Sequence, residues 1–128
     1  MFDTPYVMKL AQNLARHAGA RQAQIAKNIA NADTPGYRAR DIVDFADNFG
    51  RAPDTDFKRT RARHMTASSL TASYRTADIG GEAAPNGNNV SVEVEMARGT
   101  EAKSSHELAL TVYRSSLDIL RSSLGRGR

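Results

Sequence analysis

The sequence predicts a mainly α-helical chain in which long N- and C-terminal helices pair as an antiparallel, coiled-coil-like hairpin. Apolar residues recur at steps of three and four near both ends of the 128-residue chain, whereas no such period spans the middle. Ala, the strongest helix former, occurs 20 times, and Trp is absent. Leu, Ile, Val and Phe together number only 23, so we expect a thin core.

The first long helix is expected from Thr4 to about Ala32. Thr4 can serve as its N-cap, and Pro5 suits the first turn because a missing N–H costs nothing there. Pro35 and Gly36 should end it, because the residue before a proline avoids the α region and glycine favours a turn. Its apolar stripe consists of Val7, Leu10, Leu14, Ala18, Ile25 and Ile29.

The second long helix is expected from about Val92 to Leu124, with Gly125 as its C-terminal cap residue. Counting heptads from Met96 gives a seam that is weak through Gly99, Lys103 and His106. A hairpin of only two helices leaves much of each seam exposed, so we expect bundling with further chains. The strong part of the seam consists of Leu110, Tyr113, Leu117, Leu120 and Leu124.

The chain is expected to form one structural unit with three zones, residues 1–36, 37–89 and 90–128. The middle zone is loop-rich, and part of it is expected to be β or to be disordered before assembly. A short element is expected within residues 67–76, and residues 85–89 have the composition of a loop. The valines in residues 90–94 alternate with polar residues, which fits either a short strand or the approach to the last helix.

The net charge of +4 and the pI of about 9.8 raise the question of a nucleic-acid partner. The positive excess lies mainly in residues 51–78, which carry six Lys and Arg against three Asp, and it centres on Lys58, Arg59, Arg61 and Arg63. No zinc-finger spacing, aromatic RNA-binding motif or helix-turn-helix pattern accompanies it. We therefore expect a solvated basic loop and no nucleic-acid partner, with a basic helical protein that binds nucleic acid or an acidic surface as the alternative.

The titratable residues argue against catalysis and against a metal or cofactor. The chain has no Cys, and His17, His64 and His106 are scattered without a metal-ligand spacing. The best polar group, His106 beside Ser104 and Ser105, is made of neighbours that do not face one another on a helix. We therefore expect no enzyme and no cofactor, and we expect the histidines of the two long helices to be packing residues.

The lengths of the apolar runs in the sequence can be compared with those of signal peptides and membrane-spanning helices. The start of the chain has no apolar run of about 7 to 15 residues, and no segment approaches the ~18 apolar residues of a membrane span. We expect neither direct membrane insertion nor a cleaved signal peptide.

The most specific local feature is a ten-residue motif that spans the end of the first helix and a fixed turn. Its two asparagines place amide groups near the helix end, where unpaired carbonyls need partners. Its small alanines allow close approach of a neighbour. The motif consists of Asn28, Ile29, Ala30, Asn31, Ala32, Asp33, Thr34, Pro35, Gly36 and Tyr37.

This motif closely resembles the signature of the flagellar axial proteins, the rod, hook and hook-associated family. Within that family, the run from Asn28 to Asp41 followed by Phe45 is most similar to one short subunit of the proximal rod, because the other short rod subunit has a different run in place of the turn. The resemblance extends to residues 60–64, to the asparagines of residues 86–90 and to residues 95–97. The first half of the last helix departs from the family pattern, in residues 99–106.

The resemblance implies a structural protein of the flagellar basal body. Such subunits are exported by the flagellar type III apparatus without a cleaved signal, and they assemble helically in the periplasm with copies of themselves and with other rod proteins. The rod transmits torque and surrounds the export channel. Head-to-tail contacts between unlike surfaces generate an open helix of this kind.

Overall fold

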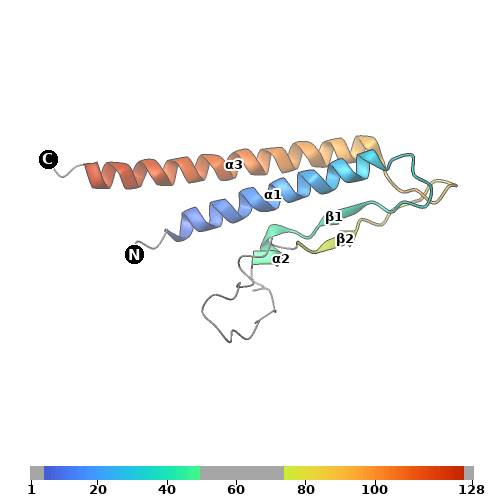
Figure 1. Cartoon of the computed structure of the whole chain (residues 1–128), viewed down its shortest axis with the longest axis horizontal. Helices are drawn as coiled ribbons and strands as arrows, with labels where there is room; N and C mark the ends of the chain where they lie inside the picture. Colours follow the sequence, from blue (N-terminus) through green and yellow to red (C-terminus); the bar gives the residue numbers. More distant parts are fainter. Residues whose placement is uncertain (1–4, 50–73, 126–128) are drawn as a thin grey trace, which may run out of the picture.

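The computed structural model describes residues 5–49 and 74–125, and it is mainly helical, as the sequence predicted. Two long helices, α1 and α3, lie side by side and antiparallel, and a two-stranded ribbon runs along the side of α1 that faces away from α3 (Figure 1). The predicted hairpin of terminal helices is therefore confirmed. The elements are α1 (Tyr6–Ala30), β1 (Arg40–Ile42), α2 (Phe45–Phe49), β2 (Thr76–Asp78) and α3 (Val92–Gly125).

Helix α1 has the expected length but slightly different ends. It begins at Tyr6, and Pro5 occupies the N-cap position without a side-chain hydrogen bond. The Pro5 carbonyl accepts from the Met8 N–H at 2.9 Å, so a backbone group takes the role expected of Thr4, which lies outside the described residues. The helix ends at Ala30, two residues before the predicted end.

Helix α3 settles the choice left open at residues 90–94. Val92 and Val94 belong to its first turn, and the Ser91 carbonyl accepts from the Glu95 N–H at 2.9 Å. At the other end Gly125 is the last helical residue and has no positive φ. The helix therefore ends at the predicted glycine, although Gly125 itself keeps a helical conformation.

The contact between α1 and α3 is lined by alanines. Ala11 and Ala18 on α1 and Ala102 and Ala109 on α3 are all buried, and each pair is separated by seven residues. A seven-residue repeat is the coiled-coil period, and side chains this small let two helices approach closely. Gly99, one turn before Ala102, also faces α1, since a Cβ there would lie 3.9 Å from Ile25 Cγ2.

The buried α3 line lies one residue before the predicted heptad. It runs through Glu95, Ala102 and Ala109, whereas Met96 is 64% exposed and Leu110 lies at the surface. The predicted path through Met96, Lys103 and Leu110 does not describe the contact with α1. Counting large apolar residues favoured the leucines, but a close helix pair buries the smaller alanines instead.

The ten predicted seam residues therefore differ in burial. Ile25 is buried, whereas Leu10, Leu14, Tyr113, Leu117 and Leu120 are half-buried at the margins of the contact. Val7, Ile29, Leu110 and Leu124 are exposed.

The ribbon is fixed to α1 by polar contacts. Strands β1 and β2 are antiparallel, with Arg40 opposite Asp78. Arg21 on α1 makes a two-pronged ion pair with Asp41, at 2.9 Å and 3.1 Å, and this hydrogen bonding raises the pKa of Arg21. The same guanidinium reaches Glu101 on α3 at 3.3 Å, so one side chain joins β1 to both helices.

The two described histidines pack as predicted. His17 is buried, donates from Nε2 to the Val43 carbonyl at 2.8 Å, and meets Phe45 and Tyr74 edge to face. His106 is half-buried, with Nδ1 3.2 Å from the Ala15 carbonyl.

Several expectations for the middle zone concern residues that the structure does not describe. The basic run of residues 58–63 and His64 lie outside the described residues. Of the short element expected within residues 67–76, only Thr76 belongs to a strand among the residues described.

Across residues 5–49 and 74–125, no helix is long and apolar enough to cross a membrane.

The alanine-lined contact predicts a steric effect. Replacing Ala102, which is fully buried, by Leu should lower the free energy of unfolding by about 1 to 3 kcal/mol, because the helices cannot separate locally without losing other contacts. Urea unfolding followed by circular dichroism measures this change. Ala97→Leu, at an exposed position of the same helix, is the control and should change stability by less than about 0.5 kcal/mol. Equal effects of the two substitutions would contradict the close contact.

Candidate functional site

The centre of the candidate site is the Asn28 side chain in the last turn of α1, which is completely buried. Its Nδ2 donates to the Arg40 carbonyl at 2.7 Å and to Glu95 Oε2 at 2.9 Å. Its Oδ1 accepts from Gln24 Nε2 at 3.1 Å, Tyr37 OH at 3.2 Å and the Arg40 N–H at 3.3 Å. One amide thus connects α1, the following loop, β1 and α3.

Glu95 is the acidic partner in this network and is only 1% exposed. Its Oε1 accepts from Arg98 Nη1 at 2.8 Å, while Oε2 accepts from Asn28. Burying a carboxylate is costly unless its charge is paired and its oxygens are hydrogen-bonded, and both conditions are met here. The carboxylate therefore fixes the register of α3 against α1.

Asn88 closes the end of α1. Its Nδ2 lies 2.8 to 2.9 Å from the carbonyl oxygens of Asn31, Ala32 and Thr34, and its Oδ1 accepts from the Val90 N–H at 2.7 Å. Carbonyls at a helix end have no partner within the helix. The side chain of Asn88, buried between the two loops, supplies that partner from a distant part of the chain.

Further contacts hold the loop after β2 against the loop after α1. Asn89 Oδ1 accepts from the Ala39 N–H at 2.6 Å, and its Nδ2 donates to the Gly80 carbonyl at 2.9 Å. The Gly36 N–H donates to the Asn86 carbonyl at 2.9 Å. We call this closed end of the hairpin, residues 28–40 with residues 84–95, the asparagine junction.

Two glycines permit the close approach of these loops. Gly36 has a φ of 72° and Gly87 a φ of 82°, both in the left-handed region that favours glycine. A Cβ on Gly87 would lie 3.3 Å from Gly36 Cα, tighter than an ordinary contact with backbone.

The structure divides the ten-residue motif between two environments. Asn28 and Tyr37 take part in the inner network, while Asn31 binds the Lys27 carbonyl and the Thr34 hydroxyl. The exposed members are Ile29, Ala30, Asp33, Thr34, Pro35 and Gly36, with Ala32 half-buried.

Glu95 and Asn88 were not predicted from the sequence as the partners of the motif. Two signals were present. Glu95 lies seven residues before Ala102 and fourteen before Ala109, on the line that faces α1, and an acidic residue on a packing line indicates a buried polar contact. Asn86, Asn88 and Asn89 form a cluster of amides, which suits loop carbonyls and N–H groups.

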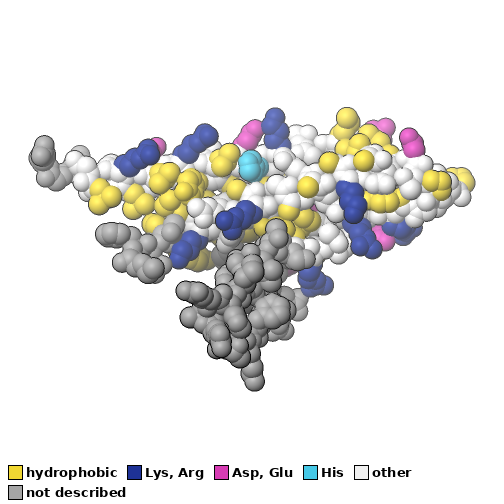
Figure 2. All heavy atoms as spheres, viewed as in Figure 1, with side chains coloured by type: hydrophobic (Ala, Val, Ile, Leu, Met, Phe, Trp, Pro, Cys, Tyr) yellow, Lys and Arg dark blue, Asp and Glu magenta, His cyan; other side chains and the backbone are white. Residues whose placement is uncertain are grey.

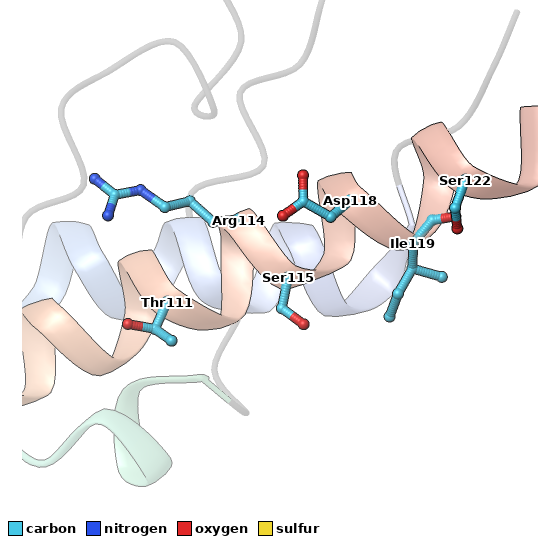
Figure 3. Close-up of a pocket in the computed structure, with 6 residues that line it drawn as sticks. All are labelled: Thr111, Arg114, Ser115, Asp118, Ile119 and Ser122. Atoms are coloured by element: carbon cyan, nitrogen blue, oxygen red, sulfur yellow. The ribbon is translucent and has the colours of Figure 1, made fainter. Parts of the chain in front are cut away.

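Two hollows lie on the surface of the described residues. One, of about 570 Å³, lies beside the asparagine junction and is lined by Gln24, Lys27, Gly36, Tyr37, Arg38, Arg40 and Thr76. The other, of about 540 Å³, lies on α3 and is lined by Thr111, Arg114, Ser115, Asp118, Ile119 and Ser122. Figure 3 shows that all six residues of the second hollow come from one helix, with small Ser and Thr side chains between the longer ones.

The chemistry of the junction is that of positioning. Its polar side chains are mostly amides, which neither titrate nor attack, and they bind backbone groups. Within residues 5–49 and 74–125, no group of three His, Asp or Glu side chains could hold a metal ion. The geometry fits a joint that sets two long helices at a fixed register.

Comparisons with known proteins agree with this structural reading. Residues 16–38 match the family model described as "Flagella basal body rod protein", a range that includes all ten motif residues. The flagellar basal body rod protein FlgB of Yersinia enterocolitica is 31% identical over 94% of both chains, and that of Salmonella typhimurium is 31% identical over 86% of both. FlgB of Bacillus subtilis is 27% identical over 91% of this chain and 92% of its own.

Replacing Gly87 or Gly99 by alanine should change stability in opposite directions, because the two glycines differ in conformation and surroundings. Gly87→Ala should lower the free energy of unfolding by about 1 to 3 kcal/mol, because alanine is strained at this φ and its Cβ meets the Gly36 backbone. Gly99→Ala, inside α3 where a Cβ would make an ordinary 3.9 Å contact with Ile25 Cγ2, should raise stability by about 0.5 to 1 kcal/mol. Urea unfolding measures both. A Gly87→Ala protein as stable as the parent would contradict the close approach of the loops.

Proposed function

The chain belongs to the FlgB family of flagellar basal body rod proteins, and on this basis we propose how it works in the rod. It is a structural component of the flagellar basal body. We propose that it assembles helically with copies of itself and with other rod and basal-body proteins, forming the proximal rod that transmits torque and lines the export channel. We also propose that the flagellar type III apparatus delivers it to the periplasm without a cleaved signal peptide.

The observation that carries the assembly proposal is the apolar surface that one chain leaves uncovered. Helix α3 has 34 residues and α1 only 25, so α3 extends about 14 Å farther at 1.5 Å per residue. Its free C-terminal part extends past the start of α1 in Figure 1. Leu124, on this part, is 83% exposed. The exposed large apolar residues of α3 are Val94, Met96, Leu108, Leu110, Val112, Ile119 and Leu124.

An exposed apolar surface of this extent is typical of an interface with another chain. Leu108, Val112 and Ile119 repeat at helical spacing on one flank of α3, next to the hollow shown in Figure 3. The small side chains in that hollow allow a neighbouring helix to approach. We therefore propose that the seam residues, which one chain covers only in part, become buried between subunits.

The ten-residue motif has a second role in this proposal. Its inner residues hold the register of α1 and α3, so its exposed residues are presented in a fixed geometry. Ile29 and Pro35 give this end an apolar outer surface. We propose that these residues contact the next subunit.

The alternative of a basic protein that binds nucleic acid or an acidic surface has no support from the family, whose curated members are rod proteins. A structural role also fits a buried polar network made mainly of amides.

The assembly proposal predicts the effect of making two exposed seam positions polar. Leu110→Gln combined with Leu124→Gln should leave the helix content of the isolated protein unchanged, because Leu124 is 83% exposed and Leu110, at 36%, is outside the buried core. It should greatly reduce the number of rods, because each residue would place an amide in an apolar interface, at a cost of about 1 to 3 kcal/mol per site. Rods counted in purified basal bodies, with immunoblots of the exported protein, measure the effect.

The control variant is Lys103→Gln combined with Arg121→Gln, two exposed α3 positions whose ion pairs contribute little. It should build normal rods. Normal rods from the leucine variant would contradict the assembly surface, and loss of its export would place the effect at an earlier step.

A further inference from the structure

The hollow beside the asparagine junction has an excess of positive charge. Three of its seven lining residues are cations, Lys27 at the end of α1, Arg38 in the loop and Arg40 on β1. Figure 2 shows several Lys and Arg side chains toward this end of the molecule, where acidic side chains are present as well. A concave site with several cations fits a partner that presents carboxylates.

Among the residues that the structure describes, only Arg38 of these three cations forms an ion pair, although Arg40 lies opposite Asp78 in the ribbon and its charge also acts on that carboxylate. Arg38 lies 3.5 Å from Asp78, with both side chains about half exposed, while Lys27 and Arg40 form no ion pair in residues 5–49 and 74–125. The Gly80 N–H, and then the charges of Arg38 and Arg40, lower the pKa of Asp78, so this single carboxylate is ionised at neutral pH and faces three cations. The hollow therefore keeps a net positive charge.

A complementary acidic surface lies on the same ribbon, at the other end of β1. Asp44 and Asp47, beside and within the first turn of α2, are both exposed. In the described part of the chain neither carboxylate forms an ion pair. This includes Arg75, although the Arg75 carbonyl accepts from the neighbouring Val43 N–H. We call Asp44 and Asp47 the acidic pair.

We propose that the basic hollow of one chain receives the acidic pair of a second copy of this chain. The two surfaces lie along the ribbon on the side of α1 that α3 does not cover (Figure 1). Arg40, at the start of β1, belongs to the hollow, whereas Asp44 follows the end of β1, and within the described residues neither Asp44 nor Asp47 forms an ion pair with a cation of the hollow. Because the surfaces differ, the contact is head to tail and repeats from copy to copy without closing into a dimer. This inference rests on the proposed rod function and specifies one of its contacts.

Charge reversal tests the pairing of these two surfaces. Lys27→Glu with Arg40→Glu should reduce the number of rods at least about tenfold, and so should Asp44→Lys with Asp47→Lys, because each variant juxtaposes like charges between copies. The protein with all four substitutions should restore rods to within about twofold of the parent, because a hollow made acidic then attracts a pair made basic. Rods are counted in basal bodies from cells whose only copy of the gene is the variant.

Controls distinguish loss of the contact from loss of folding, of export or of charge. Circular dichroism and immunoblots of the exported protein show that each variant folds and is exported. Arg16→Glu with Lys103→Glu, which makes the same change in net charge at exposed positions away from the hollow, should build rods at the parent level. Cells without the gene should build none.

The results separate this inference from the function it rests on. Rods in cells without the gene would contradict the proposed function. Normal rods from the hollow variant, or a fourfold variant no better than the two double variants, would overturn the pairing while leaving the rod function intact. Loss of rods in the hollow variant alone would also overturn it, and would indicate a carboxylate on a different neighbour.

Discussion

The fold depends on the buried hydrogen bond between Asn28 and Glu95. These residues are 67 positions apart, and their contact at 2.9 Å brings the last turn of α1 against the first turn of α3. An uncompensated carboxylate at 1% exposure would be destabilising, so this bond and the ion pair with Arg98 are conditions for closing the hairpin. Buried polar contacts of this kind are good at fixing register, because a slip of one turn leaves their partners unpaired.

The register set at this end determines what the rest of each helix buries. The alanines of α1 and α3 meet along a seven-residue repeat, and the larger residues are left at the margins or at the surface. Leu108, Val112 and Ile119 therefore remain available to neighbours, and so does the extension of α3 beyond α1. A thin core within one chain and an apolar exterior are two consequences of the same packing, and both suit a subunit that completes its core in an assembly.

The sequence predicted the helices well and their contact less well. Apolar steps of three and four located α1 and α3 closely, because helix periodicity is a local property. The contact was displaced by one residue, since the choice between the Leu110 line and the Ala109 line depends on how closely the helices approach, which is a tertiary property. The motif was found, but its partners Glu95 and Asn88 were not, because the position of Glu95 on a packing line and the run of asparagines indicate polar contacts without indicating which residues, more than fifty positions away, they contact.

The most direct test of this account is a double-mutant cycle on Asn28 and Glu95, with each residue replaced by Ala singly and together, in urea unfolding. The account predicts a coupling free energy of about 2 kcal/mol, because the bond is buried and one partner is charged. The exposed pair Asp118 and Arg121 should give less than about 0.5 kcal/mol in the same measurement. Additive effects of the Asn28 and Glu95 substitutions would contradict the claim that this contact sets the register of the hairpin.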